Sequence, residues 1–427
     1  MFQNFITKTV QIFKDPSLRR RILVVIGALA LFRVLSTIPI PGINADKLAA
    51  FFDQSAAGDI FGLVSIVSGG GLSHLSIVML GVGPYITGSI IMQLLTMIFP
   101  KLKAMYHEEG ELGRAKFTQY SRILTVPLAI VQGFGYLMLL EKSGAVESLG
   151  VIGFIANIAM ITAGSVLLMW MGELMTEFGI GNGTSMIIFA GIVAAIPTHL
   201  SQMVVNFTSS QIPMTILLAV AGVLIVLGVV IVTEAERPIP VTYAKRIRGN
   251  KVYGGVSTYL PLRVNQAGVI PIIFALSILL FPQMIFKFLA TVPNHIVASV
   301  SDYIVGVLAN GWFYSIFYFI LVFLFTYFYT AVTFDPHAIS ENLQKNGAFI
   351  PGVRPGDSTS EYISKILTRI TMVGAIFLGL VAVLPLAMKA ITGISSIAIG
   401  GTALLIVVSV VLDLIKKVDA QLSMREY

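Results

Sequence analysis

The stretch GVGPYI, residues 81–86, lies in the first half of an apolar run that extends from residue 76 to residue 99. Inside a helix, glycine costs about 1 kcal/mol relative to alanine, and proline costs about 3 kcal/mol. The stretch therefore predicts a break in a helix that is otherwise long enough to cross a membrane. The same spacing of glycine, valine, proline and isoleucine returns in GVIPII, residues 268–273. A weakness that occurs twice suggests a unit that the chain repeats.

The composition is that of a membrane protein. Of the 427 residues, 56% are hydrophobic and 11% are charged, whereas about 25% of the residues in a soluble domain are charged. Several apolar runs reach the roughly 20 residues that a helix needs to cross the hydrocarbon core. The chain has no cysteine, which excludes disulfides and cysteine-ligated metals or clusters. We therefore expect an all-α polytopic membrane protein.

Ten apolar runs are predicted to be membrane spans. They lie at residues 22–40, 74–99, 123–140, 151–172, 184–205, 213–233, 267–290, 312–334, 367–388 and 394–412. Lysine and arginine are enriched in cytoplasmic loops, so their distribution orients the spans. With both termini in the cytoplasm, 23 of the 28 lysine and arginine residues lie on the inner side and Arg33 lies within a span. The outer side then holds Lys47, Lys142, Lys287 and Lys389. This asymmetry supports the count of ten.

The two related stretches lie in the second and the seventh spans. Because these spans are an odd number apart, the two stretches cross the membrane in opposite directions. Such a pair is the signature of an inverted repeat. We therefore predict an N-terminal half, residues 1–205, with spans one to five, and a C-terminal half, residues 206–427, with spans six to ten.

A shorter apolar segment precedes the second span. Residues 59–67, DIFGLVSIV, are too few to cross the membrane, and Gly69, Gly70 and Gly71 then allow a sharp reversal. One interpretation is an ordinary outer loop with a helix at the membrane surface. The other is a re-entrant segment over residues 60–72, which must be buried in protein or line a watery cavity. The residues themselves favour neither interpretation.

Residues that carry chemistry are scarce in the predicted spans. Membrane enzymes and ion-coupled transporters place ionisable residues inside their spans, and Arg33 is the one clear case here. Glu173 and Glu177 border a predicted loop at residues 173–183, where we expect them to be solvated. The sequence lacks a zinc-protease helix, a nucleophile elbow and a phosphate-binding glycine loop. We therefore expect neither an enzyme nor a bound cofactor or metal.

Two long loops on the inner side contain many of the charged and polar residues that lie outside the predicted spans. The first, residues 234–265, contains Lys245, Arg246, Arg248 and Lys251. The second, residues 335–362, holds Arg354 between two Pro-Gly turns, which predict a rigid tip. Charged runs beside spans often only set topology or bind anionic lipid. Because these loops are longer than a connection requires, they also suit an acidic or phosphate-rich partner, such as ribosomal RNA or an acidic protein surface.

Seven stretches carry a resemblance that covers essentially the whole chain. They are FRVLSTIPIPGI (32–43), GPYITGSIIMQLL (83–95), GNGTSMIIFAGIV (181–193), YAKR (243–246), LPLRVNQAGVIP (260–271), GAFIPGVRPG (347–356) and GGTALLIVV (400–408). In this order they resemble the SecY family, the channel subunits of the bacterial Sec translocon. The resemblance implies a clamshell in which two halves enclose an hourglass-shaped pore.

The resemblance also implies where the pore is closed. The family's plug helix falls on Ile60, Phe61, Gly62, Leu63, Val64, Ile66 and Val67, and its constriction ring falls on Val82, Ile86, Thr184, Ile188, Ile273 and Ile406. Five of the six ring residues are β-branched aliphatics, which suit a seal that excludes ions by dewetting. Thr184 departs from a wholly apolar ring because of its hydroxyl.

The family's lateral gate lies between the second and third spans and the seventh and eighth spans. In this chain it would include two polar residues and the glycines and prolines of the two related stretches, which we expect to act as hinges. These residues are Gln93, Asn265, Gly81, Pro84, Gly268 and Pro271.

The resemblance further implies partners and a location. The partners are the subunits SecE and SecG, the motor ATPase SecA, the ribosome through its RNA and proteins, unfolded preproteins with their signal sequences, and membrane lipid. In family members the loops around Lys245, Arg246 and Arg354 engage the ribosome or SecA. The location is the bacterial plasma membrane, with both termini in the cytoplasm.

Three functions compete. The first is a passive channel for unfolded proteins, driven by SecA or the ribosome, with sideways release of apolar segments into lipid. The second is a secondary transporter, because inverted repeats with broken helices also build those; the scarcity of intramembrane acids speaks against it, since a coupling ion needs ligands. The third is a lipid scramblase or insertase scaffold, which leaves the long basic loops unexplained.

Overall fold

The computed structural model of the chain describes residues 15–42, 75–142, 146, 150–205, 212–243, 246–248, 251–253, 257–290, 294–392 and 395–423. The predicted plug residues, Ile60 to Val67, and the predicted partner-binding Lys245 lie outside these ranges.

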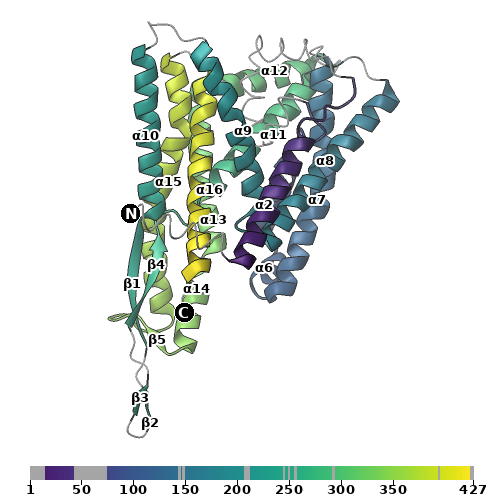
Figure 1. Cartoon of the computed structure of the whole chain (residues 1–427). Coiled ribbons are helices and arrows are strands. Elements are labelled where there is room, and N and C mark those ends of the chain that lie inside the picture. Colours follow the sequence, from purple (N-terminus) through teal and green to yellow (C-terminus); the bar gives the residue numbers. More distant parts are fainter. Residues whose placement is uncertain are drawn as a thin grey trace.

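Helices make up most of the described chain, and each predicted span overlaps one of them (Figure 1). The N-terminal half contains α2 (Pro16–Leu35), α5 (Gly83–Ile98), α6 (Pro100–His107), α7 (Gly110–Lys142), α8 (Val151–Phe178) and α9 (Gly183–Val205). The C-terminal half contains α10 (Ile212–Glu234), α11 (Ile270–Leu289), α12 (His295–Ala309), α13 (Gly311–Thr333), α14 (Pro336–Lys345), α15 (Asp357–Thr392) and α16 (Ser395–Ser423).

Not every one of these helices is by itself long and apolar enough to cross a membrane. Among the described residues, four stretches are long and apolar enough: Gly110–Met138, Val151–Phe178, Gly311–Lys345 and Asp357–Met388. A fifth is counted if α5 and α6, which meet at a bend of 116°, form one span. Shorter apolar helices occupy parts of α9, α10, α11 and α12. Length and composition therefore establish several spans.

The stretch GVGPYI is the start of a helix and not a break inside one. Residues 75–82 form turns, and a bridge between Pro39 and Ser76 ties them to the chain that leaves α2. Gly81 has a φ of +58°, a left-handed conformation that favours glycine. Helix α5 begins two residues later with Pro84 in its first turn, where a missing N–H costs nothing. The prediction of a hinge within a long helix is therefore wrong at this position.

The stretch GVIPII has the same local structure. Gly268 has a φ of +61°, α11 begins two residues later at Ile270, and Pro271 is its second residue. The two helices also run in opposite directions (Figure 1): α5 leads into α6, on the side of the molecule where the strands lie, whereas α11 leads into α12 on the other side. The recurring sequence thus encodes the same helix start twice, with opposite orientation.

A small sheet corrects the expectation of an all-α chain. Strand β1 (Glu236–Tyr243) pairs antiparallel with β4 (Ser257–Arg263), and its last two residues pair with β5 (Ala348–Phe349). Beyond β1, a two-stranded hairpin of β2 (Arg246–Arg248) and β3 (Lys251–Tyr253) extends away from the helices (Figure 1). Since β5 comes from the second predicted loop, the sheet joins the two loops that the sequence suggested were separate.

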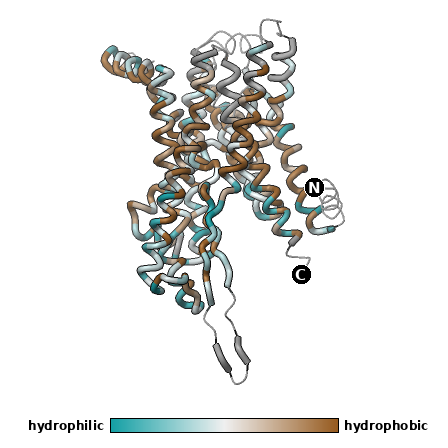
Figure 2. The backbone as a smooth tube through the Cα atoms, turned by 90° about the vertical axis from the view of Figure 1, so that its left-hand side faces the viewer, coloured by the Kyte–Doolittle hydropathy of each residue, from teal (hydrophilic) through white to brown (hydrophobic). Residues whose placement is uncertain are grey.

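Three apolar clusters hold the described parts together. The largest includes residues from both halves, a second lies between the start of α5, α7 and α8, and the third lies under the sheet. In the third, Ile239, Val241 and Leu262 pack with Ile363 and Ile366 of α15. Figure 2 shows hydrophobic residues along the helices and hydrophilic residues around the sheet. Many large apolar side chains, such as those of Ile216 and Val223, are exposed, as a lipid environment requires.

The helix starts give a prediction about stability. A methyl group added at Gly268 or at Gly27 in α2 would meet no atom within 4 Å, so the two sites differ in backbone conformation and not in space. Gly268→Ala should lower the free energy of unfolding by about 1–2 kcal/mol because alanine disfavours a left-handed φ. Gly27→Ala should leave it unchanged or raise it by about 0.5–1 kcal/mol. Thermal unfolding in detergent measures both, and a shift in the same direction would contradict this role of Gly268.

Candidate functional site

Five of the six predicted ring residues meet in the largest apolar cluster. Val82 precedes α5, and Ile86, Ile188, Ile273 and Ile406 lie in α5, α9, α11 and α16. Their exposed fractions are between 0% and 8%, so each is fully enclosed by protein. Two of the helices belong to each half of the chain. The predicted ring positions therefore lie in one packed region that both halves build.

Thr184, the sixth ring residue, is half-buried and lies in the first turn of α9, against α8. A methyl group added at Gly172 of α8 would come within 3.3 Å of the Thr184 hydroxyl oxygen, and one added at Gly183 would collide with the carbonyl oxygen of Gly172. The Gly183 N–H also donates to the Thr176 hydroxyl over 2.9 Å. The GNGTS stretch is thus a tight turn that fixes the start of α9 on α8.

Among the described residues, two separate groups of helices join the halves. Helix α11 packs against α5 and α7, and α9 packs against α16. Of the predicted gate residues, Gly81 and Gly268 precede α5 and α11, and Pro84 and Pro271 are the second residues of these helices. These four lie at the two helix starts described above, and not within the bodies of the helices.

The predicted gate residues Gln93 and Asn265 each have a buried side-chain oxygen that lacks a hydrogen-bond partner among the described residues. Asn265 is 5% exposed and donates from Nδ2 to the carbonyl oxygen of Gly268 over 3.3 Å, which stabilises the turn before α11. Its Oδ1 and the Oε1 of Gln93 are buried without a hydrogen-bond partner among the described residues. A buried polar atom without a partner costs about 1–3 kcal/mol. Both residues therefore weaken the packing in which they lie.

The two basic loops lie on the same side of the molecule, next to the sheet. Arg246, Arg248 and Lys251 belong to the β2–β3 hairpin, where the register sets Arg248 opposite Lys251. Arg354 is exposed on the turn after β5. The Thr359 hydroxyl donates to the Arg354 carbonyl oxygen over 2.8 Å, and the Ser340 hydroxyl donates to that of Gly356 over 2.6 Å. The predicted turn at Arg354 is present and hydrogen-bonded, with Gly352 and Gly356 at positive φ, and its rigidity stays a prediction.

Acidic residues near this surface are paired with lysines on their own helices. Lys345 lies 2.7 Å from Glu341 in α14, and Lys365 lies 2.8 Å from Glu361 in α15. The hydrogen bond from each lysine, helped by its charge, lowers the pKa of the partner carboxyl below its usual value. Since both pairs are exposed, they add little to stability.

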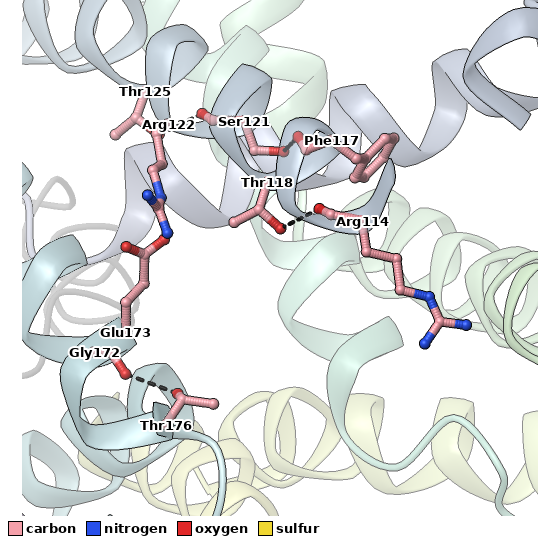
Figure 3. Close-up of polar contacts among 9 residues, drawn as sticks. All are labelled: Arg114, Phe117, Thr118, Ser121, Arg122, Thr125, Gly172, Glu173 and Thr176. Carbon is pink, nitrogen blue, oxygen red and sulfur yellow. Dashed lines mark hydrogen bonds and ion pairs between the residues drawn. The ribbon is translucent and has the colours of Figure 1, made fainter. Parts of the chain in front are cut away.

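One polar contact was missed by the sequence analysis. Glu173 is not in a loop, because α8 continues to Phe178, and its carboxylate accepts from Arg122 Nε of α7 over 2.7 Å (Figure 3). The Glu173 side chain is 18% exposed and that of Arg122 is 47% exposed. The apolar residues Leu174 and Met175 beyond Glu173 were a sign that the helix goes on.

The described residues offer no metal site. None of them form a group of three or more His, Cys, Asp or Glu side chains that could hold an ion. Arg33, the one ionisable residue predicted within a span, is exposed in the last turn of α2. The two halves can therefore enclose a path or move apart, and the basic loops can bind a partner. The described part of the chain shows no centre for covalent or metal-assisted chemistry.

Comparisons with known proteins agree with this geometry. A family model described as SecY matches residues 76–415. The protein translocase subunit SecY of Streptomyces scabiei is 39% identical over 437 residues, which cover 99% of each chain. The subunit of the same name from Mycobacterium bovis is 41% identical over 431 residues, which cover 97% of each chain.

Solved structures share the fold at lower identity. One described as the structure of a protein conducting channel has a TM-score of 0.67 at 19% identity, over 95% of this chain and 93% of that chain. A SecY structure, described as one whose plug domain stabilises the closed state and maintains a membrane seal, has a TM-score of 0.65 at 18% identity with the same coverage. Sec61 in a canine ribosome–channel complex has a TM-score of 0.62 at 18% identity, also with that coverage.

Proposed function

The chain belongs to the SecY family of protein translocase subunits, and we propose that it is the pore-forming subunit through which unfolded secretory proteins cross the bacterial plasma membrane. Membrane proteins leave the same pore sideways into the lipid. The channel is passive and is driven by SecA or by the ribosome. The observation that carries this proposal is the apolar packing of five ring residues from four helices of both halves.

The proposed architecture is ten spans in two inverted halves, residues 1–205 and 206–427. It is supported by the overlap of every predicted span with a helix and by the two identical helix starts of opposite direction. Both termini are proposed to be cytoplasmic, because this orientation places most lysines and arginines on the inner side. The sheet and its hairpin then project into the cytoplasm.

The proposed seal is the ring of Val82, Ile86, Ile188, Ile273 and Ile406, with Thr184 at its edge. A narrow apolar constriction excludes ions because water does not fill it. A plug formed by residues 60–67 would close the pore on the outer side. Two observations support a plug: the short apolar sequence of this segment, and the closed-state role of the plug domain in the related SecY structure.

The proposed lateral gate is the contact of α11 with α5 and α7. Apolar side chains there hold the helices together through contacts that, unlike hydrogen bonds, require no particular orientation. The buried oxygens of Gln93 and Asn265, which lack partners, make the packing of the closed gate less stable than a fully apolar packing. The apolar face of a signal sequence could take the place of one gate helix at this contact at a small cost in free energy. The gate is thus suited to admit an apolar segment from the pore to the lipid.

The proposed partners follow from the surfaces. The basic hairpin and the Arg354 turn suit SecA or the RNA and proteins of the ribosome, and a related channel has been solved in a ribosome complex. Lys245, Arg246, Arg248, Lys251 and Arg354 are the proposed contacts. SecE and SecG are proposed as the small membrane subunits of the same assembly.

The ring predicts a difference between two matched substitutions. Ile188 in the ring and Ile161 of α8, which lies in a separate cluster, are 2% and 0% exposed. Ile188→Ser and Ile161→Ser should each cost about 2–5 kcal/mol of stability. Only Ile188→Ser should raise the resting ion conductance of the assembled protein in planar bilayers, because it wets the constriction. Equal conductance of the two variants would contradict the assignment of the ring.

The Arg354 turn predicts an effect of charge reversal. Arg354→Glu should strongly reduce SecA-driven translocation of a signal-bearing precursor into proteoliposomes, because the acidic side chain repels an acidic partner surface. Thermal unfolding should not change, since Arg354 is exposed. The control is Lys101→Glu, the same change of charge on exposed α6. Translocation at the level of the control would show that the turn does not contact the motor.

A further inference from the structure

Helix α12 (His295–Ala309) lies at the end of the molecule opposite the strands (Figure 1). Its 15 residues make a helix about 22 Å long, which is shorter than the roughly 30 Å of the hydrocarbon core. Residues 290–294 connect it to the end of α11, and Asn310 alone connects it to α13, which starts the apolar stretch Gly311–Lys345. Because α11 ends and α13 begins at this end of the molecule, α12 lies near the membrane surface and does not cross the membrane.

Two asparagines set the limits of α12. The Ile296 N–H donates to Asn294 Oδ1 over 3.1 Å, which caps the start of α12. At the other end, Asn310 has an extended backbone, and its Oδ1 accepts from the N–H groups of Trp312 and Phe313 over 3.1 and 3.4 Å. Asn310 thus ends α12 and caps α13, so α12 is a separate helix and not a continuation of the span.

The side chains of α12 form three stripes, because residues three or four positions apart share one face of a helix. The first stripe packs toward the protein: Ser301 is 2% exposed, and Val297 and Leu308 are half-buried. The second stripe is exposed and contains polar residues and one glycine. The third is exposed and apolar, and lies between the other two. The second consists of His295, Ser299, Asp302 and Gly306, and the third of Ile296, Val300 and Tyr303.

The apolar stripe is strongly exposed and lies next to a surface that faces lipid. Ile296 and Tyr303 are each 74% exposed, and Val300 is 52% exposed. In the first turn of α13, Trp312 is 78% exposed, and further exposed apolar side chains follow it every four residues, at Ile316, Ile320 and Leu324. Tryptophan and tyrosine concentrate where a membrane meets water. The apolar stripe of α12 therefore lies at the level where the lipid-facing side of α13 begins.

The charge of α12 restricts what can cover this stripe. Residues 295–309 contain no lysine or arginine, and the polar stripe carries His295 and Asp302 as its titratable groups. Surface helices that bind anionic lipid carry basic residues on their polar face. The composition of α12 instead fits apolar insertion, which depends on buried area and not on the charge of the headgroup.

We propose that α12 is a membrane-surface anchor: Ile296, Val300 and Tyr303 insert between the lipids of the leaflet opposite the sheet, while the stripe that contains His295 and Asp302 faces water. The occupant of the apolar stripe is the boundary between headgroups and acyl chains, whatever the headgroup charge. Because Asn310 is the single residue between the two helices, the anchor also sets the depth at which α13 enters the membrane. The inference rests on the proposed architecture, in which α13 is a span.

The experiment places an environment-sensitive fluorophore on single cysteines of the full chain, which has no cysteine of its own. The complete assembly is reconstituted in phosphatidylcholine vesicles. The quenchers are a lipid with a nitroxide near the top of its acyl chain and, separately, iodide on both sides of the membrane. Labels at Ile296→Cys, Val300→Cys and Tyr303→Cys should emit at shorter wavelength and lose intensity to the lipid quencher but not to iodide. Labels at Ser299→Cys and Gly306→Cys should show the reverse. Added phosphatidylglycerol should change neither pattern.

Substitution within the stripe tests whether these side chains hold α12 at the lipid. Ile296→Ser with Val300→Ser should make the label at Tyr303→Cys lose its lipid quenching and become open to iodide. The matched control, Ser299→Ala with Gly306→Ala, changes the polar stripe and should leave that label in lipid; a methyl group added at Gly306 meets no atom within 4 Å.

A label at Ile316→Cys on α13 separates the inference from the proposed architecture. It should be quenched from lipid in every variant. If it is quenched but the labels on the apolar stripe are reached by iodide, or by neither quencher because a protein covers them, the inference alone is overturned. Lipid quenching of the stripe that appears only with phosphatidylglycerol would also overturn it. If the label at Ile316 is not quenched from lipid, α13 is not a span, and the proposed architecture fails together with the inference.

Discussion

The apolar packing of Val82, Ile86, Ile188, Ile273 and Ile406 is the interaction on which the rest of the structure depends. The same side chains form part of the core between the halves, and we propose that they close the pore. Burying one such side chain contributes about 1.5–3 kcal/mol to the stability of this packing, and apolar contacts have no preferred direction. In the proposed channel, a translocating chain takes the place of these contacts, and the seal re-forms when the chain has passed.

Several polar contacts join helices within one half of the chain. Within the N-terminal half, Ser165 and close glycine contacts hold the start of α5, and the Arg122–Glu173 pair joins α7 to α8. Two side-chain oxygens, Oε1 of Gln93 in α5 and Oδ1 of Asn265 before α11, remain without partners among the described residues. In the C-terminal half, β5 joins the sheet of β1 and β4, so a partner bound at the Arg354 turn contacts the same body that carries the hairpin. Hydrogen bonds thus join elements within one half, and apolar contacts join the two halves.

The sequence predicted the positions of the helices well, because apolar runs of membrane length leave few alternatives. The two Pro-Gly pairs predicted the turn at Arg354 from local chemistry, whereas the ring positions came only from the resemblance and stay a prediction. It failed where local chemistry has two meanings. Glycine and proline in GVGPYI are equally compatible with a break inside a helix and with a helix start. A contact distant in sequence, the bridge between Pro39 and Ser76, holds the residues before α5 outside the helix. The pairing of β5 with β1 joins residues about a hundred positions apart, which no local pattern reveals. Glu173 was expected in solvent because its partner, Arg122, lies on another helix.

The central claim is that an unfolded chain passes through the ring of apolar side chains. Because the protein has no cysteine, single cysteines at Ile86, Ile188 or Ile273 report on this path alone. A precursor that carries one cysteine and is arrested during SecA-driven translocation should form a disulfide with each of these positions. It should not form one with a cysteine at Ile161, which lies in a separate cluster, or at Ile216, which is exposed on α10. Disulfides with Ile161 or Ile216 but not with the ring positions would contradict the account.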